Sequence, residues 1–183
     1  MIAHLIFQSG RGCCFVDVRV DVDYFLAADR IIIGPPTWSI APRPNIRIMK
    51  RSLLLEGEAI DAFLHCQAFP RTQQHEFRHL IVYAGKCVAR LDFAPSEDGA
   101  HLNALSCPFD YPTGKVDHLH YHDWAANRQF GNGKALPNKL PCARVPEDRI
   151  VDIDQGFWWF CHQNNIQATS TDVPGWPPSD QLL

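Results

Sequence analysis

The sequence predicts an α+β domain with a mostly antiparallel β-sheet of hairpins and one or two helices, the clearest near the C-terminus. Many short apolar segments have strand periodicity, two of them are spaced as a hairpin, and one aromatic-rich segment near the end is typical of a helix. Strands followed by a helix, without regular alternation, favour α+β over parallel α/β folds. We expect one domain over residues 1–166 and a loosely ordered tail over residues 167–183, which are rich in Ser, Thr, Pro, Gly and Asp.

The N-terminal third is expected to form strands. From Phe15 to Val22, valines alternate with charged residues, which is the pattern of a half-buried strand. Short strands are expected at 31–33 and 38–40, where prolines follow each segment. A longer strand is expected at 46–55, before a turn at 56–58.

The middle of the chain predicts a hairpin, and the C-terminal part predicts a helix. After a strand at 62–69, the segment 77–93 contains two apolar runs joined by Ala84-Gly85-Lys86, a hairpin spacing. Alternation resumes from Asp117 to His122, and Gly131-Asn132-Gly133 indicates a loop. A helix is expected from Gln155 to Gln163 with Asp154 as its N-cap, and its four consecutive large residues indicate a core helix.

The charge balance argues against a global attraction to nucleic acid or lipid. Acidic residues number 20 against 17 basic residues, which gives a net charge of −3. Any nucleic-acid site must therefore be local. The candidates are the stretch 43–51, with four cations, and the group Arg71, His75, Arg78 and His79, although a solvated strand face would explain both equally well.

Cysteine use and the absence of long apolar runs predict a cytoplasmic protein. The seven cysteines include no CxxC pair, which argues against a disulfide framework and a zinc knuckle, so we expect reduced, mostly buried thiols. Residues 1–11 lack the basic start of a signal peptide. No apolar run approaches the ~18 residues that cross a bilayer, so no membrane partner is expected.

Three histidines form the main concentration of chemistry. His118, His120 and His122 would point to one side of a strand, with Leu119 and Tyr121 facing the core. Imidazole is a good ligand for Zn, Fe, Ni or Cu, so two or three of them, with His101 or Asp123, could hold a metal ion and leave a position for water.

The same histidines could instead act as a general acid and base without a metal. Transfer at a phosphodiester would also need a cation, for which Arg90 is the candidate, while Asp92 on the same face could pair with it or orient a histidine. His101 and Asn103 would follow in the next loop. Each group also has a structural interpretation. The three histidines could be surface residues on an edge strand, Arg90 and Asp92 could form a cross-strand ion pair, and His101 and Asn103 could cap turns.

Taken together, the motifs Arg90-x-Asp92, His101-x-Asn103 and His118-x-His120, followed by a short aromatic helix, resemble the TumE-type toxins of bacterial toxin–antitoxin pairs. The resemblance covers residues 77–166. It implies a ribonuclease-like active site in these motifs, an RNA substrate and an antitoxin protein as partner.

These observations give three hypotheses. The first is a small hydrolase acting on RNA, in which His120 and His118 serve as acid and base, Arg90 holds phosphate, Asp92 orients and His101 completes the groove. The second is a metal-dependent enzyme in which His101, His118, His120 and His122 hold one divalent transition metal such as Zn. The third is a non-catalytic binding module that uses exposed Trp124, Trp158 and Trp176. An antitoxin would bind near Trp158 and Trp159 or near the 43–51 stretch. The sequence does not indicate the oligomeric state.

Overall fold

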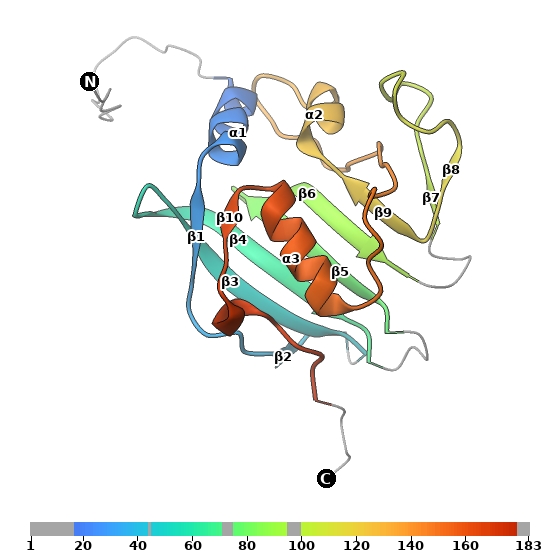
Figure 1. Cartoon of the computed structure of the whole chain (residues 1–183). Helices are drawn as coiled ribbons and strands as arrows, with labels where there is room; N and C mark the ends of the chain where they lie inside the picture. The colour runs from blue at the N-terminus through green and yellow to red at the C-terminus, as the bar shows by residue number, and fades with distance from the viewer. Residues whose placement is uncertain (1–16, 44, 71–74, 95–99, 179–183) are drawn as a thin grey trace, which may run out of the picture.

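A computed structural model describes residues 17–43, 45–70, 75–94 and 100–178, and it is centred on one twisted, mostly antiparallel sheet (Figure 1). The strand order is β10-β1-β3-β4-β5-β6-β9, β2 pairs with β3, and β7 and β8 form a separate two-stranded sheet. The pairing of β1 with β10 is parallel, and the remaining pairings are antiparallel. The predicted α+β class is confirmed.

The elements follow one another in a simple order. The strands are β1 (Arg30–Ile33), β2 (Ser39–Ile40), β3 (Arg47–Leu55), β4 (Glu58–Ala68), β5 (Phe77–Tyr83), β6 (Lys86–Phe93), β7 (His101–Leu102), β8 (Lys115–Val116), β9 (Leu119–His122) and β10 (Ile166–Gln167). The helices are α1 (Val18–Ala27), α2 (Trp124–Asn127) and α3 (Ile153–Gln163), with 3₁₀ turns η2 (Arg128–Phe130) and η3 (Ser170–Asp172).

The strands predicted after residue 30 are confirmed with small shifts of their ends, including the hairpin of β5 and β6. Its turn residues Ala84 and Gly85 have φ values of 47° and 73°. Positive φ at both central residues is typical of the tight turns that match the twist of a hairpin. The register of β5 and β6 shifts between Ile81 and Val82, so the turn and this irregularity together determine which residues of β6 face each side of the sheet.

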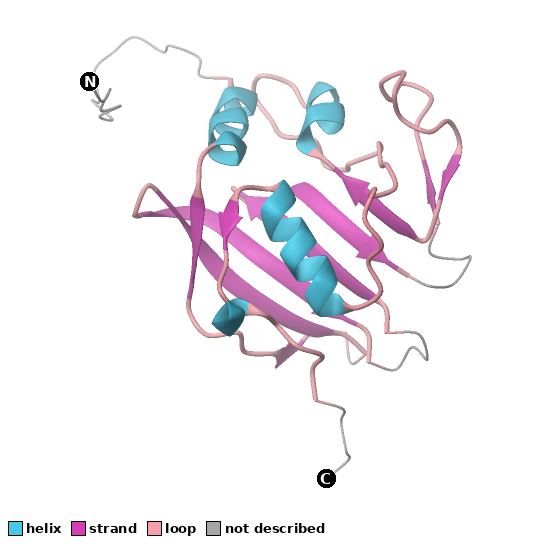
Figure 2. Cartoon of the chain, in the orientation of Figure 1, coloured by secondary structure: helices cyan, strands magenta, loops and turns pink. Residues whose placement is uncertain are grey.

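One face of the sheet carries the core, and helices α1 and α3 cover it (Figure 2). One cross-strand row on this face is completely buried, and it consists of Met49, Cys66, His79, Leu91 and Tyr121. Helix α3 packs Phe157 and Phe160 into the same core. Its N-cap is Asp152, whose side chain accepts from the backbone of Gln155, and not Asp154 as predicted.

The predicted strand from Phe15 to Val22 is wrong over its described part. Residues 15 and 16 lie outside the described residues, and α1 begins at Val18, where Asp17 caps the helix. Val22 and Phe25 are buried while Val20 is 53% exposed, so burial follows a helical period and not alternation. Over so short a stretch, the spacing of the valines fits both the two-residue period of a strand and the 3.6-residue period of a helix.

The expected loose tail is packed over most of its described part. Residues 166–167 pair with β1, and η3 follows. Val173 and Trp176 pack against the core, and the carboxylate of Asp154 accepts a hydrogen bond from the backbone of Gly175 at 3.0 Å. Apolar residues spaced among the prolines therefore fix this segment to α3 and the sheet.

The cysteines differ from the prediction of reduced thiols, because Cys107 and Cys142 form a disulfide. Cys66 and Cys161 are free and buried, as expected, and Cys87 is free and half-buried. Disulfides persist mainly in oxidising compartments, so the cytoplasmic location stays a prediction. No helix in the described ranges combines the length and apolar character needed to cross a bilayer.

Neither basic stretch forms the patch considered from the sequence. Arg47 and Arg51 are buried on the core side, where Arg51 pairs with Asp172 at 2.6 Å. Because side chains alternate along β3, Lys50 is its only cation on the opposite face. His79 is completely buried, and Arg71 lies outside the described residues.

Two of the three tryptophans predicted to be exposed are in fact packed. Trp124 is buried and donates to Asp23, and Trp176 contacts the core and the ring of His75. Only Trp158, at 43% exposure, remains as predicted.

Candidate functional site

Strands β6 and β9 bring the predicted arginine, aspartate and two of the histidines together. Their antiparallel register places Arg90 opposite His122 and Asp92 opposite His120. His101, on the neighbouring strand β7, completes the group, with its ring centroid 4.5 Å from that of His122 and 5.5 Å from that of His120. We call His101, His120 and His122 the histidine triad.

Each imidazole of the triad is oriented by a backbone carbonyl. The distances are 3.0 Å from His101 Nε2 to Pro141 O, 2.8 Å from His120 Nδ1 to Asp117 O, and 3.1 Å from His122 Nδ1 to Cys142 O. A carbonyl only accepts hydrogen bonds, so each of these nitrogens carries the proton and the other nitrogen of a neutral ring presents its lone pair. One ring nitrogen from each of the three histidines lies within 4.8 Å of the other two.

Asp92 is the carboxylate of the site. Its Oδ2 lies 3.4 Å from Nε2 of both His120 and His122 and 2.5 Å from Nε of Arg90. Burial alone would raise the pKa of this carboxyl, but the two histidines and the Arg90 guanidinium outweigh burial and hold the pKa well below its ordinary value. Asp92 is therefore a fixed negative charge beside the triad.

The electrostatics of the site favour neutral imidazoles at His101 and His122. Burial lowers the pKa of His122 to about 4, and burial also lowers the pKa of His101. Nη2 of Arg90 lies 2.8 Å from Nε2 of His122, so the guanidinium donates to that lone pair. Nε2 of His120 lies 3.4 Å from Asp92 Oδ2, so a cation held between these two atoms would contact both.

The triad lies behind a pocket of about 440 Å³ that His101 and Arg90 line. His120 and His122 are only 3% and 0% exposed, while the Arg90 side chain is 32% exposed. The wall beyond β6 comes from the loop of residues 138–141, which includes Lys139. A molecule in the pocket would meet Arg90 and His101 first and the other two imidazoles last.

His118 lies apart from the triad, although the sequence predicted it on the same face. Strand β9 begins at Leu119, so the alternation that aligns His120 and His122 does not include residue 118. The ring of His118 is exposed, pairs with Asp117 at 2.5 Å and packs on Phe93. Its predicted roles as base and as ligand are therefore not compatible with its position.

Asn103 also has a different place from the one predicted. Its amide is buried, donates to the carbonyls of Pro112 and Ala143 at 2.8 Å each, and accepts from the backbone of Ala143 at 2.7 Å. This side chain joins the β7–β8 hairpin to the loop that orients the triad. It makes no contact with Asp92 or the imidazoles among these bonds.

Sequence reasoning missed the residues that support the triad. Asn127, at the end of α2, donates to Cys142 O at 2.8 Å and accepts from Cys142 N at 2.9 Å. Pro141 and Cys142 act through their backbone carbonyls. Backbone acceptors cannot be recognised from the sequence of side chains, although Asn127 and the disulfide residue Cys142 could have drawn attention to this loop.

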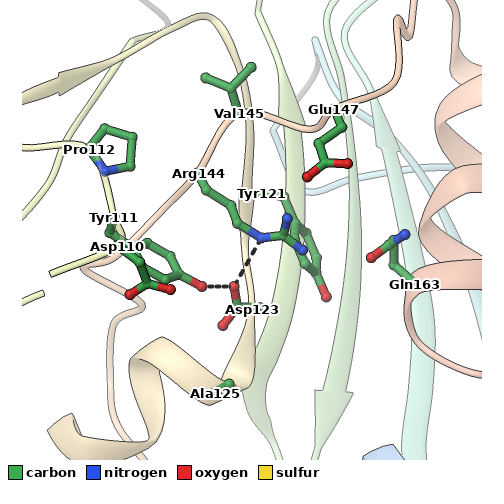
Figure 3. Close-up of a pocket in the computed structure, with 10 residues that line it drawn as sticks. All are labelled: Asp110, Tyr111, Pro112, Tyr121, Asp123, Ala125, Arg144, Val145, Glu147 and Gln163. Carbon is green, nitrogen blue, oxygen red and sulfur yellow. Dashed lines mark hydrogen bonds and ion pairs between the residues drawn. The ribbon is translucent and has the colours of Figure 1, made fainter. Parts of the chain in front are cut away.

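Asp123, considered from the sequence as a metal ligand, belongs to a different pocket (Figure 3). It accepts from Tyr111 Oη, lies 3.4 Å from Nε of Arg144, and caps α2 through Ala126. This pocket, of about 650 Å³, is also lined by Tyr121. Since Tyr121 alternates with His120 and His122 on β9, the pocket lies on the other side of that strand from the triad.

The arrangement thus combines three oriented imidazoles, one ionised carboxylate and a partly exposed guanidinium. Such a donor set can hold a transition metal ion, and it can also take part in proton transfer. Comparisons with protein-family models, with curated proteins and with solved structures found no match. The resemblance to TumE-type toxins therefore stays a prediction.

Proposed function

We propose that this protein is a metal-dependent hydrolase of phosphodiesters, in which one divalent metal ion is held by His101, His120 and His122 and takes the place of the Arg90 guanidinium at Nε2 of His122. The observation that carries the proposal is the convergence of one ring nitrogen from each histidine within 4.8 Å, in three rings that are each oriented by a hydrogen bond to a backbone carbonyl. Histidines that ligate metals are oriented in this way through their second nitrogen.

Burial favours a metal over direct proton transfer by His120 and His122. At 3% and 0% exposure these rings cannot touch a polymeric substrate, whereas an ion that reaches them would sit between them and the pocket. Asp92, 3.4 Å from both rings, would offset the charge of the ion or supply a fourth ligand. Imidazole and carboxylate ligands suit Zn and the neighbouring divalent transition metals.

The pocket suits an anionic ester. Among the described residues that line it, the charged ones are Arg90 and Lys139, and none is a carboxylate. When bound, the metal would supply a hydroxide by lowering the pKa of a water ligand. Hydrolysis would join a water oxygen to phosphorus and break the ester P–O bond, with the proton of the water going to solvent and the leaving oxygen taking one from solvent, while Arg90 would offset the charge on the phosphate.

Elemental analysis of the purified, zinc-loaded protein tests the proposal. We expect about one metal ion per chain in the wild type and loss of that ion in His120→Ala and in His122→Ala. His118→Ala is the matched control because it removes an imidazole of the same motif that lies outside the triad. Folded wild-type protein that retains no Zn, Ni, Co or Fe at stoichiometric level would rule the proposal out.

A metal-free ribonuclease toxin is the second candidate, and the contact of Arg90 with His122 at 2.8 Å favours it. In that case Arg90 would hold phosphate while His101, the half-buried member of the triad, transfers the proton. An RNA substrate, an antitoxin partner and a cytoplasmic location belong to this candidate. RNA cleavage that persists in chelator-treated, metal-free protein and is lost in His101→Ala would favour it over the metal-dependent enzyme.

A further inference from the structure

Two cross-strand rows of side chains lead from the histidine triad across the sheet, on the face opposite α3. The first row runs over β3, β4, β5, β6 and β9 through Lys50, His65, Leu80, Arg90 and His122. The second row runs beside it through Ile48, Gln67, Arg78, Asp92 and His120. Because neighbouring strands lie about 4.8 Å apart, Lys50 is about 14 Å from Arg90 along the first row.

These rows carry an excess of positive charge. Their permanent cations are Lys50, Arg78 and Arg90, and their one carboxylate, Asp92, is paired with both arginines, at 2.9 Å and 2.5 Å. Glu76, just before β5, contacts Arg78 at 3.1 Å. Most of the side chains are half-buried, as on a solvated sheet face, and Lys50 is exposed.

The positive charge continues into the pocket beside the triad. Arg90 belongs to both the first row and the pocket, and Lys139 lies on the opposite wall. Lys86 adds a third cation, because its Nζ donates to the pocket residue Asn138 at 2.7 Å. In a chain of net charge −3, this is a local concentration of cations that ends at the candidate metal centre.

We propose that the substrate is a single-stranded nucleic acid whose backbone follows the first row from Lys50 to Arg90 and places one phosphate in the pocket. This inference rests on the proposed phosphodiester hydrolysis and extends it to a substrate class. A row of cations that ends in a pocket matches an extended polyanion, since cationic grooves that track the backbone are how proteins hold single strands. The rows are two residues apart along each strand, about 7 Å, which suits a single chain and not the width of a duplex.

The expected binding is electrostatic and therefore salt-dependent. Each phosphate contact with a single strand contributes about 0.7 to the slope of log affinity against log salt. With Lys50, Arg78, Arg90 and Lys139 in contact, the slope should be about −3. Lys50→Ala should weaken binding several-fold for every sequence and reduce the slope by about 0.7. Lys50→Arg should keep the affinity and the slope of the wild type.

Fluorescence anisotropy with a labelled oligouridylate, its DNA counterpart and a duplex, over about 50 to 200 mM salt, tests the inference. Arg149→Ala is the matched control, because it removes one exposed cation just before α3, on the other face of the sheet, and should leave binding unchanged. Equal losses in Lys50→Ala and Arg149→Ala, tighter binding of the duplex, or tighter binding of polyglutamate would each overturn the inference.

The same titration with His120→Ala separates this inference from the proposed function. The variant lacks a metal ligand but keeps every side-chain cation of the first row, so it should retain salt-dependent binding that Lys50→Ala weakens further. Normal metal content without salt-dependent binding would overturn the binding path alone. Salt-dependent binding in a protein that holds no metal would overturn the metal-dependent hydrolase alone.

Discussion

His122 and Cys142 are joined through the backbone, because Nδ1 of His122 donates to the Cys142 carbonyl at 3.1 Å. The side chain of Cys142 forms the disulfide with Cys107. The preceding carbonyl, of Pro141, accepts from His101 at 3.0 Å. One covalently fixed loop therefore orients two of the three imidazoles, and the third depends on Asp117.

The disulfide should stabilise both the fold and the site. It links residues that are 35 positions apart, and a loop of this length corresponds to about 4 kcal/mol of unfolding free energy. The Cys107→Ser/Cys142→Ser double variant should lose about that amount in urea titrations and bind zinc more weakly in competition with a chromogenic chelator. Cys87→Ser, which removes a free thiol, is the control. Equal stability in the double variant and the wild type would contradict this account.

Asn127 should support metal binding without touching the metal. Its amide donates to Asp123 O at 2.7 Å and pairs with both backbone groups of Cys142. Asn127→Ala leaves these buried groups unpaired, which should cost about 2–4 kcal/mol of stability and about 10–100-fold in zinc affinity. Exposed Asn138→Ala should change stability little. Undiminished zinc affinity in a destabilised Asn127→Ala would limit this residue to a structural role.

Most of the sheet could be predicted because local alternation determines which side of a strand is buried. Alternation along β6 puts Arg90 and Asp92 on one face, so they could be placed together from the sequence. The turn at Ala84 and Gly85 does not by itself fix which face that is, because the β5–β6 register shifts between Ile81 and Val82. The α1 helix could not, because Val18 and Val22 fit both a strand and a helix, and the burial of Val22 and Phe25 depends on distant residues such as Tyr83.

Only those parts of the site that follow from alternation along a strand could be predicted. The spacing of His120 and His122 placed both imidazoles on one face, whereas the exclusion of His118 depended on the point where β9 begins. The disulfide could not be predicted from the sequence, because seven cysteines allow many pairings and their spacing alone does not choose between them. The β1–β10 pairing joins segments more than a hundred residues apart, a distance over which sequence periodicity carries no information.

His79 should make stability depend on pH. Its Nε2 lies 3.0 Å from Ile153 O, its Nδ1 lies 3.2 Å from Cys66 Sγ, and burial lowers its pKa from 6.5 to about 4. The unfolded chain therefore binds a proton that the folded chain excludes, so this contribution is complete above pH 6.5 and is lost as the pH falls towards about 4. The loss is about 3 kcal/mol in total.

Urea unfolding at a series of pH values measures this effect. The difference between wild type and His79→Gln removes the contribution of other groups, and Gln can still donate to the Ile153 carbonyl. We expect the wild type to lose more stability than His79→Gln between pH 6.5 and about 4. Parallel stability curves for the two proteins would show that His79 is not the group responsible.

Gly156 should be required for the close approach of α3 to the sheet. A Cβ at this position would lie 2.6 Å from Cε2 and 2.9 Å from Cζ of Phe77, whose ring is stacked on Phe93. In an exposed helix, Gly→Ala stabilises by about 1 kcal/mol, but overpacking of a core costs about 1–3 kcal/mol. We therefore expect Gly156→Ala to lower the unfolding free energy, with the midpoint of urea unfolding as the readout.

A second substitution tests whether Phe77 is the cause. Phe77→Leu removes the ring atoms that the new methyl group would meet, so Gly156→Ala should cost less in the Phe77→Leu background than in the wild type. The exposed residue His162, on the same helix, gives a control, and His162→Ala should change stability by less than about 0.5 kcal/mol. A Gly156→Ala variant that is more stable than the wild type would mean that α3 has room to move away from Phe77, and the close packing of helix and sheet would then not determine where this helix lies.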